Sequence, residues 1–547
     1  MGKETTSAGQ GAVLLTVLGA VSQLLGFGYR VALARIVGAQ VMGLYQLLMP
    51  MYAVVLSLTA VGLTAAVSNL TAQYLARGNA RGADQALSAC LKLFLLVLLP
   101  VGGWLIFASD FVSVVLLGDA RTQLGLILLV PCVALTGVEN FHKHWFYGAG
   151  LVRPPAVTEL CEQLVRSAAV LGLLWLFLPQ YPERAVGLVV AGMVICEVFS
   201  AATLAVLYRR RRRGVLSGPG EPGAVRRRRI AAIALPVGLN ALLGNLLGAA
   251  NAALIPQKLV EGGMAREDAI AQLGVVCGMT LPMLALPTVF LGALNLVLLP
   301  RLARARALDR WDRVQQLAQR ALSIVGVLAL PAMAWMTVVG PALGQLLFGR
   351  PVDSYLLPLA AVMALSCFCS VLGAILNGVG RQGTVAAISL LGGGVQLALT
   401  LVLVPLPGVG MGGYVAGALV SAWLEALLCL ALTLRHTGLA LRPLPWLIAP
   451  GLAALLSALT MSLLQRRDLS GIWGSPLSGR PLRPGGGAWA HLPAAGVMVS
   501  PLCRPRPAPA RLHLPARDAH RGGHRPSRGW DGTRAPGPRP VWCPRSG

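Results

Sequence analysis

Residues 91–107, LKLFLLVLLPVGGWLIF, decide the fold of this chain, because they hold a single charged side chain across a length close to one membrane crossing. Comparable apolar runs occupy residues 164–178 and 324–339. A backbone inside lipid must satisfy its own hydrogen bonds, and none of these runs alternates as the strands of an outer-membrane barrel do. The sequence therefore predicts an all-α integral membrane protein.

The composition of the whole chain agrees with that class. Of its 547 residues, 56% are hydrophobic and 12% are charged, whereas a soluble domain carries about 25% charged residues. The first apolar run, residues 11–34, is too long for the core of a signal peptide and is predicted to remain as a helix. The ten cysteines are scattered without the spacing of a zinc site, so neither a metal nor a cofactor is expected.

Charged and Gly/Pro-rich stretches divide the apolar runs into thirteen predicted spans. The first twelve form two sets of six, separated by a basic connector, and one extra span follows them. The predicted spans are 11–34, 41–67, 86–108, 122–147, 155–178, 185–208, 230–256, 270–298, 316–340, 355–377, 383–405, 411–434 and 444–464.

Much of the formal net charge of +26 lies between spans. Two Arg runs, 209–213 and 226–229, sit where basic clusters set topology and contact anionic lipid headgroups, so nucleic acid is not an expected partner. With a cytoplasmic N-terminus, each inside loop carries Arg, whereas the few basic residues outside are mostly offset by acids. The distribution predicts a multi-pass protein of a bacterial cytoplasmic (inner) membrane.

The two sets of six spans also share a sequence pattern. Pro100, Trp104 and Gly118 recur 231 positions later, Gly148 and Gly150 recur 230 positions later, and the VAG of residues 190–192 recurs at 415–417. An even number of spans per repeat places both copies in the same orientation. The predicted organisation is a six-helix lobe (1–208), a basic cytoplasmic linker (209–229), a second six-helix lobe (230–436) and an extra helix (437–465).

Residues 466–547 form a tail of different character. They are rich in Arg, Pro and Gly and contain no Lys or Glu, a composition that does not build a core. We hypothesise that a frameshift in a GC-rich gene has replaced the natural C-terminus and a fourteenth helix. Translation of the other two reading frames beyond codon 465 tests this, because one of them should then encode an apolar helix.

Several motifs resemble one known family. They are GFGYR at 26–30, ARIVGA at 34–39, GLYQ at 43–46, EQxxR at 162–166 and GVVCGMxLP at 274–282. Together they resemble the stage V sporulation protein B group, in the polysaccharide-flippase branch of the multidrug/oligosaccharidyl-lipid/polysaccharide exporter superfamily. The chain departs from that group at Gln23, where relatives usually carry Arg, and at Asn251, where they often carry an acid.

The resemblance implies a MATE-like fold of two six-helix lobes facing a cavity. It also implies a flippase that moves a lipid-linked oligosaccharide or peptidoglycan precursor, undecaprenyl-linked in the relatives, with a role in spore cortex or cell-envelope synthesis. Alternating access of the two lobes, with no catalysis, is the implied mechanism. Two alternatives are a cation-coupled multidrug exporter of MATE type and a membrane-embedded glycosyltransferase or ligase, for which no nucleotide or nucleophile motif is present.

Charged residues inside spans are the first candidates for the transport site, because a buried charge costs several kcal/mol. The planar fork of Arg suits a pyrophosphate, which makes Arg30 and Arg35 candidates, although Arg35 can also extend to the outer headgroups. Glu162 and Arg166 are spaced i, i+4, so they form either part of a substrate site or a self-neutralising helical pair.

Further candidates have weaker signals. A buried unpaired carboxylate tends to hold a proton, which makes Glu197 and Glu425 candidates for ion coupling or merely tolerated acids. Asn245 and Asn251 either line the cavity or hydrogen-bond between helices. A cytoplasmic entrance, or plain interfacial solvation, is expected at Glu139, Lys143 and Glu159.

Overall fold

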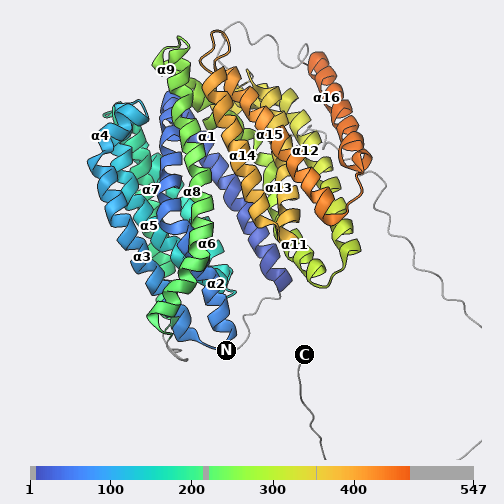
Figure 1. Cartoon of the computed structure of the whole chain (residues 1–547). Helices are drawn as coiled ribbons and strands as arrows, with labels where there is room; N and C mark the ends of the chain where they lie inside the picture. Colours follow the sequence, from blue (N-terminus) through green and yellow to red (C-terminus); the bar gives the residue numbers. More distant parts are fainter. Residues whose placement is uncertain (1–7, 213–220, 353, 469–547) are drawn as a thin grey trace, which may run out of the picture. The chain divides into compact units, whose positions relative to one another are not determined.

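The computed structural model describes residues 8–212, 221–352 and 354–468, and the predicted tail beyond Asp468 and part of the linker lie outside these residues. The described part is helical, as predicted (Figure 1). The first lobe contains α1 (Ala8–Leu56), α2 (Gly62–Ala76), α3 (Ala80–Phe107), α5 (Gln123–Gly148), α6 (Arg153–Phe177) and α7 (Ala185–Arg212). The second contains α8 (Gly223–Glu261), α9 (Arg266–Leu273), α10 (Leu281–Leu284), α11 (Val289–Ala307), α12 (Trp311–Phe348), α13 (Leu356–Gly378), α14 (Gln382–Leu403) and α15 (Met411–Thr437).

Short turns join or interrupt these helices, and one helix follows the second lobe. The short elements are η1 (Ser57–Val61), α4 (Ser109–Phe111), η2 (Val112–Leu116), η3 (Ala120–Thr122), η4 (Pro182–Arg184), η5 (Gly274–Thr280), η6 (Leu286–Thr288) and η7 (Leu444–Ile448). The extra helix, α16 (Ala449–Asp468), packs on α12.

Eleven helical stretches of the described residues are long and apolar enough to cross a membrane. The first, Val17–Ala76, is 60 residues long and contains two predicted spans, which meet where the backbone leaves the helical region at Gly38 (φ 74, ψ −179). The predicted span 270–298 is not one regular α-helix. There the chain is broken into α9, η5, α10, η6 and α11, because π and 3₁₀ turns interrupt the helix around Pro282 and Pro287.

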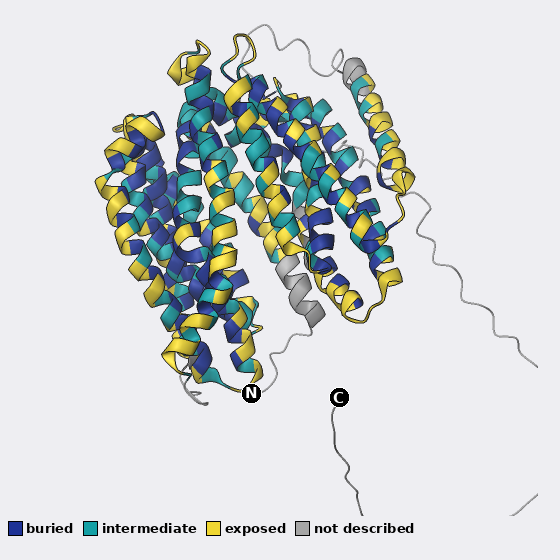
Figure 2. Cartoon of the chain, in the orientation of Figure 1, coloured by how far each residue is buried: buried dark blue, intermediate teal, exposed yellow. Residues whose placement is uncertain are grey.

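Exposed residues run along the outer helices (Figure 2), and many of them are large and apolar. On α3, Leu96 is 68% exposed, Leu99 73% and Phe107 91%, while Phe94 on the opposite side is fully buried. A soluble protein rarely exposes such a continuous apolar surface. This face of α3 is therefore suited to lipid contact.

The two lobes repeat the same packing. The helix α7 packs on α5 and α6, as α15 packs on α13 and α14. The glycines that recur in sequence also take the same left-handed backbone conformation, with φ of 78° at Gly118 and 68° at Gly349, and of 73° at Gly150 and 77° at Gly380. Since only glycine adopts these values without strain, the repeat extends to the ends of the helices.

The lobes meet where α8 lies on α1 and α2, and where η5 lies on α1. Glycines allow this close approach of backbones: a Cβ atom on Gly62 would collide with the carbonyl oxygen of Ala234, and one on Gly274 with that of Ala39. Small residues at such contacts are typical of helix packing in membranes. The contact between lobes is thus made by main chain as much as by side chains.

Candidate functional site

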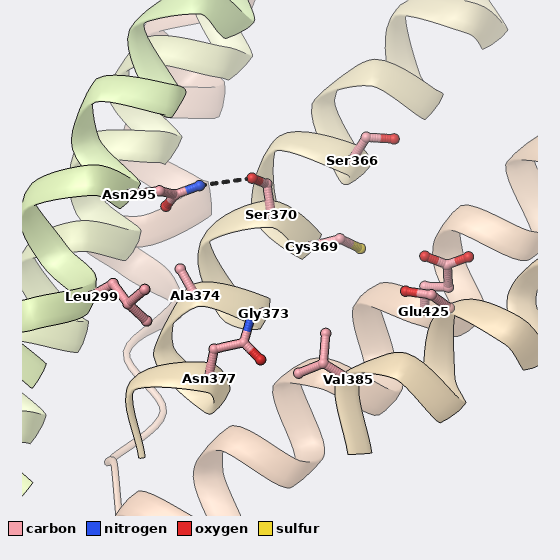
Figure 3. Close-up of a pocket in the computed structure, with 11 residues that line it drawn as sticks. Asn295, Leu299, Ser366, Cys369, Ser370, Gly373, Ala374, Asn377, Val385 and Glu425 are labelled. Carbon is pink, nitrogen blue, oxygen red and sulfur yellow. Dashed lines mark hydrogen bonds between the residues drawn. The ribbon is translucent and has the colours of Figure 1, made fainter. Parts of the chain in front are cut away.

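Four helices of the second lobe, α11, α13, α14 and α15, enclose an open-sided cavity of about 450 Å³ (Figure 3). Its wall is made of amides, hydroxyls and small residues with a single carboxylate, that of Glu425. Asn295 Nδ2 donates a 2.9 Å hydrogen bond to Ser370 Oγ across the cavity wall. The lining residues are Asn295, Leu299, Ser366, Cys369, Ser370, Gly373, Ala374, Asn377, Val385, Ser389 and Glu425.

Glu425 reaches this cavity because α14 offers it space. The carboxylate of Glu425 lies against Gly392, where a Cβ atom would collide with it. Within the described chain, Glu425 makes no ion pair. The sequence indicated this residue, but the amides and hydroxyls around it were not predicted, since Ser and Asn in spans are common packing residues.

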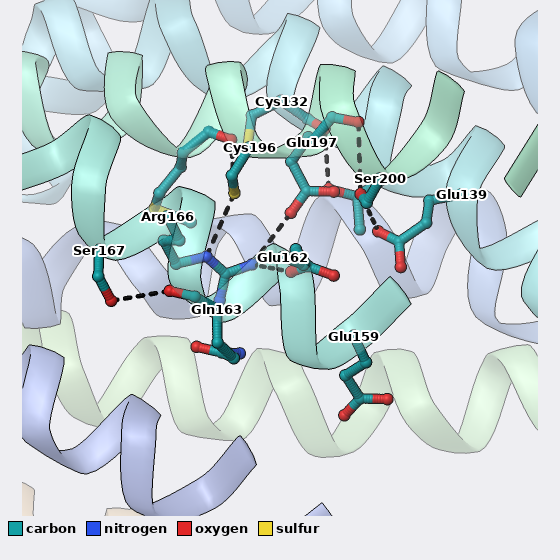
Figure 4. Close-up of polar contacts among 12 residues, drawn as sticks. Cys132, Glu139, Glu159, Glu162, Gln163, Arg166, Ser167, Cys196, Glu197 and Ser200 are labelled. Atoms are coloured by element: carbon teal, nitrogen blue, oxygen red, sulfur yellow. Dashed lines mark hydrogen bonds and ion pairs between the residues drawn. The ribbon is translucent and has the colours of Figure 1, made fainter. Parts of the chain in front are cut away.

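A buried charged network occupies the first lobe (Figure 4). At its centre, the guanidinium of Arg166 on α6 pairs with Glu162 one turn earlier and lies 3.3 Å from Oε1 of Glu197 on α7. Arg166 Nε also donates to Cys196 Sγ at 3.3 Å. The predicted i, i+4 pair therefore forms, and a second carboxylate from a neighbouring helix joins it.

The network extends along α5. Ser200 Oγ on α7 donates a 3.0 Å hydrogen bond to Glu139 Oε2. Lys143 Nζ lies 3.7 Å from Glu139 Oε1 and 3.1 Å from Glu159 Oε2, which joins α5 to α6. The three predicted entrance residues, Glu139, Lys143 and Glu159, thus lie together and belong to the same network as the α6 pair.

Carboxylates outnumber cations in this network. Glu139, Glu162 and Glu197 are only 3%, 6% and 2% exposed, and Oε2 of Glu197 has no hydrogen-bond partner among the described residues. Buried charges without compensation are costly. The arrangement can therefore take up a proton or a cation at the unpaired oxygen.

Three side chains here could act as ligands of a metal ion, but the position between them is occupied by a guanidinium group. Ligand atoms of Glu162, Cys196 and Glu197 lie within 4.8 Å of one another. All three, however, already contact the guanidinium of Arg166. A metal would have to displace this cation, so we assign none.

The two arginines of α1 lie in different surroundings. Arg30 is half-buried and makes no hydrogen bond or ion pair within the described part of the chain. Arg35 is exposed, and its guanidinium donates to the carbonyl oxygens of Leu346 and Leu347 at the end of α12, with 2.6 Å from Nε to the second. The structure therefore does not bring Arg35 together with the first-lobe network.

The two predicted amides lie on α8. Asn245 Nδ2 donates to the carbonyl oxygen of Ala53 at 3.3 Å, which links α8 to α1. Asn251 is buried, and its Oδ1 has no partner among the described residues. The first amide thus has the inter-helix bond that was one of its two expected roles, while the second keeps a free acceptor.

The end of the linker that the structure describes is held against α2. Tyr74 Oη donates to the carboxylate of Glu221, and Arg229 Nη1 donates to its other oxygen at 3.0 Å. Arg229 also lies over the Tyr74 ring and donates to Gln73 Oε1 at 2.6 Å. The hydrogen bond from Tyr74, followed by the bond and charge of Arg229, lowers the pKa of Glu221 below its usual range.

Comparisons with known proteins place the chain among transporters. The profile of the family described as polysaccharide biosynthesis protein matches residues 8–306, more than half of the chain. Stage V sporulation protein B of Bacillus subtilis is 24% identical over 409 residues, which cover 74% of this chain and 79% of the relative.

Solved structures show the same fold. An inward-facing multidrug resistance MATE family transporter of the MOP superfamily superposes with a TM-score of 0.61 at 14% identity, covering 78% of this chain and 98% of that one. A MOP superfamily transporter from Pyrococcus furiosus, described as having a binding pocket of reversed polarity, superposes with a TM-score of 0.56 at 15% identity, covering 80% and 99%.

Proposed function

Because this chain belongs to the polysaccharide biosynthesis protein family and is a flippase-type transporter, we propose that its cargo is a lipid-linked oligosaccharide or peptidoglycan precursor. The likeness to stage V sporulation protein B supports a role in spore cortex or cell-envelope synthesis. The partners on this proposal are the lipid-linked sugar, anionic headgroups and other proteins of envelope synthesis. The proposal assigns no catalytic residue and no cofactor.

One observation carries the choice of a diphosphate-linked cargo. Arg30 is a half-buried cation inside a membrane span that has no hydrogen bond or ion pair within the described residues. A guanidinium inside a membrane span without a counter-charge is unfavourable, and a phosphate anion satisfies it through paired N–H donors. Arg166, by contrast, is already bound by two glutamates. We therefore assign the phosphate contact to Arg30.

Contacts between the lobes on the side away from the linker support entry of the cargo from the side of the N-terminus. There Gly274 packs tightly on Ala39, and Arg35 donates to the last carbonyl oxygens of α12. The contact of Gly62 with Ala234 lies nearer the linker and would have to open for the cargo to enter. On this proposal the lobes rock about the far contact, which opens the side of the linker.

We also propose that the N-terminus and the linker face the cytoplasm, with the protein in the cytoplasmic (inner) membrane. The Arg-rich linker and the loops after α5, α11 and α13 lie at the ends of spans that share one side by alternation, and the positive-inside rule assigns that side to the cytoplasm. Labelling of a cysteine introduced at exposed Ala224 with an impermeant reagent tests the orientation. Labelling from outside the intact cell contradicts it.

The first-lobe network favours a second candidate, a cation-coupled exporter of MATE type. Buried carboxylates in excess over cations are suited to binding the ion that drives such an exporter. The two candidates differ in cargo and not in fold. A drug exporter would move amphipathic cations and would be indifferent to the loss of a phosphate-binding arginine.

Movement of fluorescent lipid-linked sugars in proteoliposomes tests the function. We expect transport by the wild type and a loss of about tenfold or more in Arg30→Ala, since a charge-assisted contact to phosphate is removed. Arg184→Ala, which removes an exposed outer-loop arginine, is the matched control and should retain transport. Equal rates in wild type and Arg30→Ala would remove Arg30 from the mechanism, and no transport in either would refute the proposed cargo.

A further inference from the structure

The repeat relates the second-lobe cavity to the first-lobe network. Gly150 and Gly380, 230 positions apart, follow α5 and α13 with the same left-handed φ. On the next helices, Val170 packs on Gly192, and Leu399 and then Thr400 pack on the matched Gly417. An offset of 230 therefore aligns α5 with α13, and it aligns α6 with α14 to within one residue.

In this alignment, large charged side chains in the first lobe correspond to small residues in the second. Three of those small residues line the cavity, and the fourth receives the carboxylate of Glu425. The corresponding pairs are Glu139 and Cys369, Lys143 and Gly373, Glu159 and Ser389, and Glu162 and Gly392. The cavity is thus the place that the charged network fills in the first lobe, left open by smaller side chains.

The carboxylate also changes position between the lobes. The matched glycines of α7 and α15, Gly192 and Gly417, are 225 positions apart, and the same offset aligns Ser200 with Glu425. In the first lobe Ser200 donates to Glu139, whereas in the second a carboxylate stands at the serine position and faces Cys369 (Figure 3). Glu425 is therefore the acidic group of an open cavity instead of one member of a closed network.

The chemistry of the wall selects a kind of ligand. Hydroxyls and amides act as both donors and acceptors, and a carboxylate accepts hydrogen bonds from hydroxyls. The described lining contains no lysine or arginine, so it offers no cation to a phosphate. Oδ1 of Asn295 is buried and has no partner among the residues that the structure describes, which leaves an acceptor to be satisfied. A neutral group rich in hydroxyls fits this wall, and about 450 Å³ falls within the usual range of small-molecule sites.

We propose that this cavity, walled by Asn295, Ser370, Asn377 and Glu425, binds the sugar part of the cargo, apart from its phosphates. The inference rests on the proposed function and adds a division of labour to it. Arg30 on the first lobe holds the diphosphate, and the second lobe recognises the hydroxyl groups of the sugar. A lipid that carries a sugar would then contact both lobes, whereas a lipid without a sugar would contact only the first.

Binding to the full-length chain in lipid nanodiscs tests the proposal with two probes, undecaprenyl diphosphate and the same lipid bearing one hexose. Gly373→Leu fills the cavity, and its Cβ is tolerated because Val385 lies at 3.5 Å. We expect it to weaken binding of the sugar-bearing lipid by about tenfold and that of the bare lipid by no more than about twofold. Gly383→Leu, at an open position outside the cavity, is the matched control.

Glu425→Gln keeps the shape of the site and serves if the leucine variant does not fold. It should weaken binding of the sugar-bearing lipid severalfold and leave the bare lipid unchanged, because an oxygen of the carboxyl group is replaced by an amide NH₂ that cannot accept a hydrogen bond. Equal effects on both lipids, or no effect on either, overturn the assignment of the cavity while the proposed function stands. If the wild type binds neither lipid, the proposed cargo is refuted and this inference with it.

Discussion

Arg35 Nε donates a 2.6 Å hydrogen bond to the main-chain carbonyl oxygen of Leu347, and the same guanidinium reaches the preceding carbonyl. Arg35 belongs to the first lobe, and Leu347 lies in the last turn of α12 in the second. The last carbonyls of a helix have no partner within it and carry partial negative charge. A side chain of one lobe thus caps a helix of the other on the side away from the linker.

Arg35→Ala should loosen this side of the contact between lobes. Because Arg35 is exposed, water weakens its two hydrogen bonds. We therefore expect the rate of cysteine labelling beside this contact to rise only severalfold, which is less than the loss of two buried charge-assisted bonds would give. The measurement is the labelling rate of Ala39→Cys, a buried position beside the contact, in a chain without its native cysteines. The rate should rise in Arg35→Ala and remain unchanged in the control Arg184→Ala. An unchanged rate in both would show that the cap does not hold the lobes.

The first-lobe network predicts a large loss of stability when its cation is removed and a small one when one of its acids is removed. Arg166→Met leaves Glu162 and Glu197 facing each other without compensation, and breaking a buried pair in this way costs about 3–5 kcal/mol. Glu197→Gln removes one carboxylate from a network that has an excess of them, so it should cost little. Thermal unfolding in detergent should show a much lower Tm for Arg166→Met than for Glu197→Gln. A lower Tm for Glu197→Gln than for Arg166→Met would contradict an excess of carboxylates in the network.

The linker contact should depend on pH. The pKa of Glu221 is lowered by the hydrogen bond from Tyr74 and by Arg229, so the contact is present above the ordinary glutamate value of about 4.3 and is lost as the pH falls through the lowered pKa. A spin label on Ala224→Cys should stay immobile from pH 8 to 5 and gain mobility at lower pH. Glu221→Gln should raise its mobility at neutral pH, whereas Glu183→Gln should not.

Close backbone contact predicts a sharp difference between two glycines. A Cβ atom on Gly62 collides with the carbonyl oxygen of Ala234 on α8, whereas one on Gly103 meets nothing within 4 Å. Gly62→Ala should therefore lower Tm by separating α2 from α8. Gly103→Ala, in an open part of α3, should leave Tm equal or raise it, since alanine favours a helix by about 1 kcal/mol. Similar Tm values for the two variants would mean that α2 and α8 can move apart without a loss of stability.

Apolar length was enough to predict most helices. The predicted spans 355–377, 383–405 and 411–434 correspond to α13, α14 and α15 within a few residues, because a membrane crossing fixes how long each run must be. The interruption at Leu286–Thr288 was missed. Hydropathy indicates which residues lie in lipid, but it does not detect a change in backbone hydrogen bonding within an apolar run.

The site was predicted only where it is local. The pair of Glu162 and Arg166 follows from spacing on one helix, but the addition of Glu197 depends on how α7 packs on α6. The second-lobe cavity has no charged signal except Glu425, since glycine, serine and asparagine occur in many spans for packing alone. The sequence repeat could have found it, had the offset of 230 been followed from Gly380 back into α13.

The interruption between η5 and α11 separates two tasks on one membrane crossing. Before it, Gly274 lies tightly on α1, and after it, Asn295 and Leu299 form a wall of the cavity. Helices bend most readily where their regular bonding is broken. A tilt of α11 about Leu286–Thr288 would therefore widen or narrow the proposed sugar-binding cavity while Gly274 remains packed on α1. The pocket would then adjust to its sugar independently of the rocking that opens the space between the two halves.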